Sequence, residues 1–152
     1  MSKDIRIYVD MDDVLCDYTK SYLDALKKEP KIKYPQSQYG FFRNLKPKES
    51  AITIFKILSK RFDVWILSSP PINNPLSYSE KREWVETHLG FEYCERLILS
   101  TNKSLLIGDF LIDDIKQDNF KGEQILFGKE PYDDWHKVYG YFKERFQMSI
   151  HD

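Results

Sequence analysis

Apolar residues fall in short runs that alternate with stretches of helical spacing. Residues 5–9, 62–67, 96–99 and 124–127 are rich in β-branched, leucine and aromatic residues, which is typical of buried strands. Between them, apolar residues recur every three or four positions at about residues 49–60 and 80–89, as in amphipathic helices. Such alternation predicts βαβ units and a parallel sheet, with a last helix that Asp133 or Asp134 caps.

The segment from about residue 16 to 45 interrupts this alternation. A helix is expected at about Tyr18 to Lys28, and aperiodic chain with two prolines and Gly40 follows it. This segment reads as an insertion between the first strand and the next regular helix. Its adjacent residues Phe41 and Phe42 either fill the core or line a pocket. Further along, Ser77 and Glu80 have the spacing of a capping box at the start of a helix.

The first strand runs directly into carboxylates, of which Asp10 and Asp12 come first. Desolvating a carboxylate without a partner is too costly for these groups to lie unpaired in the core. They must therefore lie at the edge of the sheet. Open α/β sheets bind their ligands beyond the carboxyl ends of the strands, so Asp10 and Asp12 are candidate site residues.

Three further polar features follow strand ends or lie beside them, in the order Ser68, Lys103, then the pair Asp113 and Asp114. Clustered carboxylates suit a hard cation such as Mg²⁺, which takes oxygen ligands. A lysine and a hydroxyl beside that cation suit a phosphate. The chemistry indicated is phosphoryl transfer, in which a carboxylate can itself attack phosphorus and form an aspartyl-phosphate.

Composition narrows the class of protein. The chain has 152 residues, 41 % of them hydrophobic and 15 % aromatic, which indicates one folded domain. A net charge of −1 with both signs interspersed argues against binding to nucleic-acid polymers or membranes. No apolar run is long enough to span a bilayer, and we expect a cytoplasmic protein. The two cysteines lack metal-ligand spacing, and Cys16 is expected to be a small core residue.

The order of these features resembles that of the haloacid dehalogenase-like phosphatases and, more narrowly, the 5′(3′)-deoxyribonucleotidases. The resemblance covers about residues 5 to 128. The matching segments are Asp10-Met11-Asp12-Asp13-Val14-Leu15, Gly40-Phe41-Phe42-Arg43-Asn44-Leu45, Ser69-Pro70, Glu80-Lys81 with Trp84-Val85-Glu86, and Asp109-Phe110-Leu111-Ile112-Asp113-Asp114. The resemblance implies a single domain, residues 1–152, built as a three-layer α/β sandwich with a mostly parallel Rossmann-like sheet. A small helical and loop cap would occupy about residues 16–45, after the first strand.

The resemblance also implies roles for the acidic residues. Asp10 would be the nucleophile and a metal ligand. Asp12 would be the general acid and base, and its backbone carbonyl would bind Mg²⁺. Asp114 would be the third protein ligand of the metal, with Asp113 as the alternative.

The remaining implied site residues would bind substrate. Ser68 and Lys103 would hold the transferring phosphate, with Lys81 and Ser69 assisting. Ser68 stands where a threonine is expected, a change that keeps the hydroxyl. Independently of the resemblance, the aromatic residues Tyr39, Phe41 and Phe42 lie together in the insertion, and Phe41 is expected to stack on a nucleobase.

The function expected is therefore a Mg²⁺-dependent phosphomonoesterase that dephosphorylates nucleoside monophosphates through an aspartyl-phosphate. Its partner is a small phosphate ester, and a homodimer is left open. The alternatives are a phosphatase of the same superfamily for another small ester, such as a sugar phosphate, and a non-enzymatic phospho-acceptor or scaffold domain. A nuclease would need a basic surface, which the charge balance does not offer. In a receiver domain the acidic pair comes first and the lysine last, whereas here Lys103 precedes Asp113.

Overall fold

The computed structural model describes residues 3–149, and in this range five strands form one sheet in the order β3-β2-β1-β4-β5. Every neighbouring pair of these strands is parallel. The strands are β1 (Arg6–Val9), β2 (Asp63–Ser68), β3 (Leu97–Leu99), β4 (Phe110–Asp113) and β5 (Glu123–Leu126). This arrangement confirms the predicted α/β class with a parallel sheet.

Helices separate most of the strands along the chain. The α-helices of the described residues are α1 (Tyr18–Lys28), α2 (Ala51–Arg61), α3 (Leu76–His88) and α4 (Trp135–Phe146). Three 3₁₀-helices, η1 (Pro35–Ser37), η2 (Phe91–Arg96) and η3 (Lys103–Leu105), complete this part of the chain. None of the helices between residues 3 and 149 is both long and apolar enough to cross a membrane.

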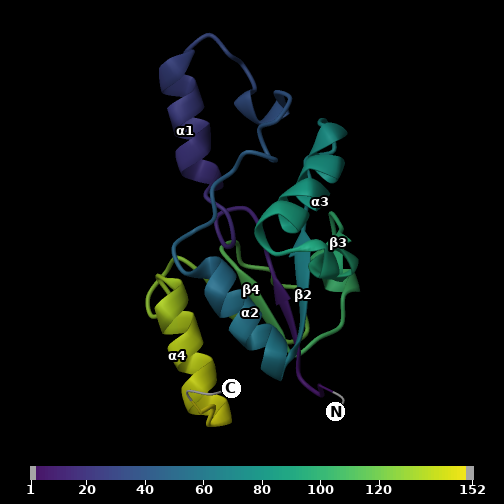
Figure 1. Cartoon of the computed structure of the whole chain (residues 1–152), viewed down its shortest axis with the longest axis vertical. Coiled ribbons are helices and arrows are strands. Elements are labelled where there is room, and N and C mark those ends of the chain that lie inside the picture. Colours follow the sequence, from purple (N-terminus) through teal and green to yellow (C-terminus); the bar gives the residue numbers. More distant parts are fainter. Residues whose placement is uncertain (1–2, 150–152) are drawn as a thin grey trace.

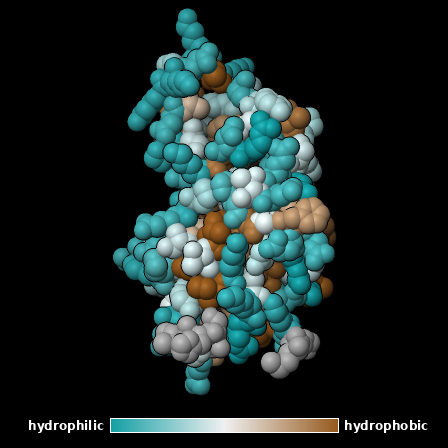
Figure 2. Space-filling view, viewed as in Figure 1, coloured by the Kyte–Doolittle hydropathy of each residue, from teal (hydrophilic) through white to brown (hydrophobic). Residues whose placement is uncertain are grey.

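The two faces of the sheet are covered differently. Residues such as Ile7 and Val9 point to the face where α2, α3 and α4 pack, and they share the main core with Trp84 and Phe142. The opposite face carries Tyr8, Leu67 and Leu111, which pack against Phe120 and Leu106 from irregular chain near η3 and before β5. The layer on that side is therefore thinner than the helical layer. On the face seen in Figure 2, hydrophilic side chains dominate and apolar ones emerge mainly at the level of α2.

Between β1 and α2 the chain leaves the sheet as α1, η1 and the loop to residue 45, at the end of the molecule opposite the start of β1 (Figure 1). Both connections meet at one stem, where Asp17 N–H donates to the Lys46 carbonyl and Lys48 N–H donates to the Leu15 carbonyl, each at 2.8 Å. The indole N–H of Trp84 also donates to the Leu45 carbonyl at 2.7 Å. The insertion is thus anchored to the body of the molecule where it leaves and re-enters.

The start of α3 differs from the capping box predicted at Ser77 and Glu80. The helix begins at Leu76, and the Asn74 side-chain oxygen accepts a hydrogen bond from the Leu76 N–H at 3.1 Å. The Ser77 hydroxyl donates to the Asn74 carbonyl at 2.6 Å. The capping-box prediction was wrong because the helix begins before Ser77, which places both Ser77 and Glu80 inside it, and the N-cap residue, Pro75, makes no side-chain capping hydrogen bond.

Asp63, at the start of β2, gives the fold a predicted sensitivity to acid. Burial alone would raise the pKa of Asp63, but hydrogen bonds from Arg6, Arg96 and Trp65 outweigh it and lower the pKa below its ordinary value. A carboxyl group of this kind contributes stability above its unfolded pKa of about 3.9, and the contribution is lost as the pH falls through the folded value. We expect Asp63→Asn to lower the free energy of unfolding at pH 7 by about 1 kcal/mol or less, because solvent screens both arginines.

Urea unfolding of both proteins between pH 7 and pH 2 checks this expectation. The difference between wild type and variant should vanish toward the acid end of the series. A difference that stays constant with pH would contradict the role given to Asp63.

Candidate active site

At the carboxyl ends of β1 and β4, the buried ammonium group of Lys103 lies between the carboxylates of Asp10 and Asp113. Asp10 follows β1, and its backbone N–H donates to the Ile112 carbonyl at 2.9 Å. The Lys103 ammonium donates to Asp10 Oδ1 at 2.9 Å and to Asp113 Oδ2 at 2.7 Å. The side chains of Lys103 and Asp113 are only 5 % and 1 % exposed. Residues far apart in the sequence therefore converge at the sheet edge, where the sequence predicted a site.

Asp114 completes an acidic cluster at this edge. Carboxylate oxygens of Asp10, Asp113 and Asp114 lie within 4.8 Å of one another. Both oxygens of Asp113 accept hydrogen bonds, one from Lys103 and the other from the Ile115 N–H at 3.0 Å. Asp114 Oδ1, by contrast, is buried and has no hydrogen-bond partner among residues 3–149. Because an unsatisfied buried acceptor is costly, this oxygen is open to a ligand.

The charges in the cluster do not balance. Burial raises the pKa of Asp10 well above its ordinary value, and the charge of Asp113 adds to this, although Lys103 opposes it. Burial likewise raises the pKa of Asp114 to about 6. Burial would lower the pKa of Lys103, but the charges of Asp10 and Asp113 outweigh it and raise that pKa. Three carboxylates thus compete for one ammonium group, and a divalent metal ion could bind the cluster and neutralise the excess negative charge.

Asp12 lies beside a second lysine. The ammonium group of Lys81, a fully buried residue of α3, donates to Asp12 Oδ2 at 3.0 Å. It also lies 4.6 Å from the centre of the Phe42 ring. The Cys16 sulfur is 3.7 Å from the other Asp12 oxygen, and burial raises the pKa of that thiol well above its ordinary value. Cys16 is fully buried, which confirms the expectation of a small core residue.

The two serines after β2 differ in their surroundings. Ser68 is 1 % exposed, and its hydroxyl oxygen is buried without a hydrogen-bond partner in the described part of the chain. Ser69 is exposed and lines a cavity of about 360 Å³. The Ser68 hydroxyl is therefore free to bind a ligand, and it lies next in the chain to the accessible Ser69 hydroxyl.

The same cavity brings together most of the predicted residues and adds others. Its lining includes the predicted residues Asp10, Asp12, Ser69, Lys103, Asp113 and Asp114. Residues that the sequence did not single out also line it, namely Asp13, Tyr18, Thr19, Ile115 and Gln117. The aromatic wall of this cavity is Tyr18, in the first turn of α1. The sequence feature that could have identified Tyr18 as a site residue is its position shortly after the acidic residues that follow β1.

Phe41 lies behind Tyr18. The centres of the two rings are 5.5 Å apart, and Phe41 lines a separate hollow of about 490 Å³ within the insertion. Phe42, only 2 % exposed, is part of the main core. Of the two adjacent phenylalanines, one fills the core and the other lines a pocket that differs from the acidic cavity.

Comparison with known proteins assigns this chain to a family. The family model described as "5' nucleotidase, deoxy (Pyrimidine), cytosolic type C protein" matches residues 27–139. A protein of Vibrio phage KVP40, provisionally named 5'(3')-deoxyribonucleotidase, is 42 % identical over 142 residues, which cover 89 % of this chain and 82 % of that protein. The human cytosolic-type 5'(3')-deoxyribonucleotidase is 30 % identical over 155 residues, covering 82 % of this chain and 76 % of that protein.

A solved structure shares the fold. It is the class C acid phosphatase from Bacillus anthracis with tungstate bound, with a TM-score of 0.50 and 17 % sequence identity. The match covers 66 % of this chain and 42 % of the acid phosphatase chain.

The acidic cluster at the sheet edge and these relatives identify the protein as a phosphoric monoester hydrolase. Within that class, the chain belongs to the 5′(3′)-deoxyribonucleotidase family, which confirms the resemblance predicted from its motifs.

Proposed function

We propose that this protein is a Mg²⁺-dependent 5′(3′)-deoxyribonucleotidase that releases phosphate from nucleoside monophosphates through an aspartyl-phosphate on Asp10. The observation that carries the proposal is the buried bridge from Lys103 to Asp10 and Asp113, which lies beside an unsatisfied oxygen of Asp114. The names of the phage and human relatives support the choice of substrate.

The reaction would take two steps at Asp10. In the first, a carboxylate oxygen of Asp10 attacks phosphorus, the bond from phosphorus to the leaving oxygen breaks, and Asp12 donates a proton to that oxygen. In the second, a water molecule attacks the phosphorus of the aspartyl-phosphate and gives a proton to Asp12. The bond between phosphorus and Asp10 then breaks, which releases inorganic phosphate and restores both carboxyl groups.

Lys103 and the serines would bind the transferring phosphate. The ammonium group of Lys103 already touches Asp10, so a phosphate at Asp10 lies within its reach. The unused hydroxyl of Ser68 suits an anionic oxygen, and Ser69 lines the cavity from which the substrate enters. These contacts hold phosphorus in line with the nucleophile, which is how enzymes of this type gain most of their rate.

Asp10, Asp114 and the backbone carbonyl of Asp12 would hold Mg²⁺. The unsatisfied Asp114 oxygen fits a metal ligand, whereas Asp113 has both oxygens engaged by the protein. When bound, the ion would neutralise charge on the acidic cluster and on the phosphoryl oxygens.

We further propose that residues 16–45 act as a cap on a single domain, residues 1–152. The insertion has one anchored stem, and Tyr18 at its base lines the acidic cavity. A nucleobase would stack on Tyr18, while Phe41 supports the Tyr18 ring from behind. Stacking on an aromatic side chain contributes roughly 1–3 kcal/mol per base.

A comparison of two aromatic variants tests this function. Tyr18→Ala should lower kcat/KM for a deoxynucleoside monophosphate by roughly 5- to 150-fold, the equivalent of that stacking energy. A small sugar phosphate has no base to stack, and its kcat/KM should change little. Phe41→Ala should show the same selectivity with a smaller effect. A wild-type enzyme that prefers sugar phosphates would overturn the nucleotidase proposal.

The metal assignment makes a separate prediction. Asp114→Ala should raise the Mg²⁺ concentration needed for half-maximal activity by at least roughly 10-fold, because even indirect contacts to a metal are worth 10- to 100-fold. Activity of chelator-treated enzyme, titrated with MgCl₂, measures this. Asp118→Ala is the control. Asp118 is exposed, and within residues 3–149 its salt-bridge partner is the exposed Lys116. Full activity in excess chelator would contradict the metal requirement.

A further inference from the structure

Lys81 belongs to the Glu80-Lys81 motif, and its contacts do not match a phosphate ligand. The residue is fully buried, although lysine is almost never buried unless it is paired. Its ammonium group touches Asp12 and the Phe42 ring. The cavity that Asp10, Asp12 and Lys103 line does not include Lys81 among its lining residues. Lys81 therefore lies behind Asp12 and not on the wall of this cavity.

We infer that Lys81 is a positioning residue, which fixes the Asp12 carboxyl group for proton transfer and does not bind phosphate. The inference rests on the role proposed above for Asp12. It assigns to the Glu-Lys motif a function different from the phosphate binding expected from its resemblance.

The geometry of the Asp12 carboxyl group carries this inference. A carboxyl group has two oxygens and can rotate, so proton transfer to a defined atom requires one oxygen to be held. Lys81 holds Oδ2 at 3.0 Å, a charge-assisted hydrogen bond. For the other oxygen, Oδ1, the hydrogen-bond donor found within residues 3–149 is the Cys16 thiol at 3.7 Å, and a thiol is a weak donor. Oδ1 is thus left to exchange a proton with the leaving oxygen.

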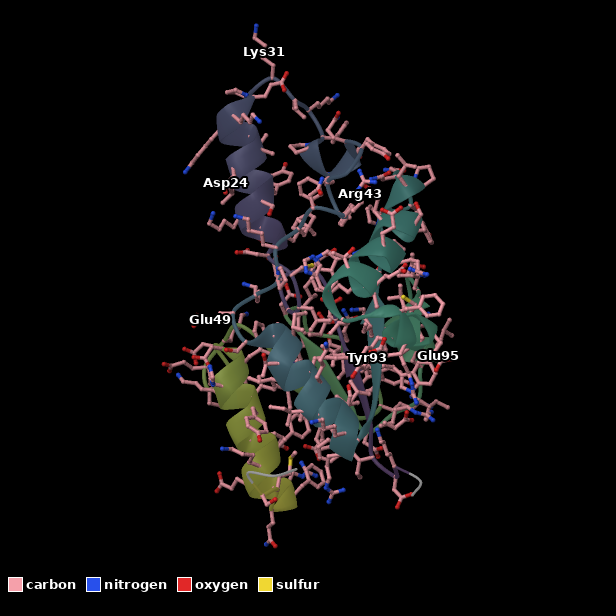
Figure 3. All side chains as sticks on the ribbon, viewed as in Figure 1. Asp24, Lys31, Arg43, Glu49, Tyr93 and Glu95 are labelled. Carbon is pink, nitrogen blue, oxygen red and sulfur yellow. The ribbon has the colours of Figure 1, made fainter. Side chains whose placement is uncertain are left out.

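Lys81 is itself held in place by the insertion. Its ammonium group packs on Phe42. The preceding residue, Glu80, is 2 % exposed and lies near Gly40 and Arg43 of the insertion, although neither of its carboxylate oxygens has a hydrogen-bond partner among residues 3–149. Arg43, a residue of the insertion that Figure 3 labels beside α3, also pairs with Glu83 at 3.4 Å. One turn of α3 therefore contacts both the loop of the insertion and Asp12, which leaves Lys81 little freedom to move toward a phosphate.

Two substrates with different leaving groups test the inference. A deoxynucleoside 5′-monophosphate releases an alkoxide, which needs a proton, whereas p-nitrophenyl phosphate releases a stable phenolate. The ratio kcat/KM reports the steps up to departure of the leaving group, so the later role of Asp12 as a base does not enter it. We expect Lys81→Met to lower kcat/KM for the nucleotide by roughly 10- to 100-fold, part of the worth of a positioned general acid. For p-nitrophenyl phosphate the loss should be under about 3-fold, and inhibition by inorganic phosphate should be unchanged.

The matched control is Arg82→Met, on the same helix. Arg82 is partly exposed and pairs with Glu86, so both substrates should be turned over as by the wild type. A second test places Lys81→Met in the Asp12→Asn background. If Lys81 acts through Asp12, the double variant should be no slower on the nucleotide than Asp12→Asn alone, within about 3-fold.

Equal losses for the two substrates, together with weaker inhibition by phosphate, would overturn the inference and make Lys81 a phosphate ligand. Losses that multiply in the double variant would overturn it too. If Lys81→Met does not fold, Lys81→Gln, which keeps a shorter donor, allows the same comparison. Failure of the proposed function looks different, because the wild type would then lack activity on nucleotides or Asp10→Asn would retain it.

Discussion

Asp10→Asn should reduce turnover of nucleoside monophosphates by roughly 10⁵- to 10⁶-fold, the scale on which loss of a covalent nucleophile acts in other hydrolases. An amide is a poor nucleophile toward phosphorus and cannot form the aspartyl-phosphate. The loss should be chemical and not a failure to fold. In the variant the Lys103 ammonium keeps its second carboxylate partner, Asp113, at 2.7 Å, so no buried charge is left unpaired.

Two measurements separate chemistry from folding. Thermal unfolding of Asp10→Asn should match that of the wild type within a few degrees. Acid-quenched wild-type enzyme should gain the mass of one phosphoryl group during turnover, and the variant should gain none. Asp118→Asn, at an exposed acidic position, is the matched control and should behave as the wild type. Near-normal hydrolysis by Asp10→Asn would exclude the aspartyl-phosphate mechanism.

The sheet and the convergence at its edge could be predicted because each depends on a local rule. Ile7 and Val9 are β-branched residues in a short apolar run, a local pattern that predicts a buried strand, and both are buried in β1. The carboxylate of Asp10 could not lie unpaired in the core, and parallel strands end at one edge. Those two constraints were enough to place Asp10, Lys103 and Asp113 together, across separations of up to 103 positions in the chain from Asp10 to Asp113.

The roles of Lys81 and Tyr18 could not be derived in this way. A lysine near the start of a helix reads as a solvated residue, and nothing local reveals a partner 69 positions earlier in the chain. The insertion is aperiodic after α1, so the sequence does not fix which aromatic ring faces the acidic cavity. Tertiary packing decides it, and gives that position to Tyr18 while Phe41 faces the hollow behind.

The covering of the second sheet face was also beyond local rules. Tyr8 and Leu111 are buried there, yet they pack against Phe120 from irregular chain rather than against an α-helix. The apolar run at residues 105–112 contains only the short strand β4, because η3 and extended chain occupy its first part. That chain carries Lys103 to the buried position between the carboxylates.

The position of Lys103 predicts the largest effect on stability. Lys103→Met should lower the free energy of unfolding of the metal-free protein by about 3–5 kcal/mol, the cost of removing one partner from a buried ion pair. Asp10 and Asp113 would remain buried at this edge without their shared cation. Urea unfolding at pH 7 in the presence of a chelator measures the loss. Activity should fall as well, because the variant cannot neutralise the transferring phosphate.

Added Mg²⁺ separates this electrostatic effect from a simple packing defect. A divalent ion on the acidic cluster supplies the missing positive charge, so it should restore part of the lost stability of Lys103→Met, and more than it adds to the wild type. Lys116→Met, at an exposed lysine that pairs with Asp118, is the control and should unfold like the wild type. A Lys103→Met protein as stable as the wild type without metal would show that the acidic cluster does not depend on Lys103. A loss of stability that Mg²⁺ leaves unchanged would instead assign the effect to packing, and would count against a metal site at Asp10 and Asp114.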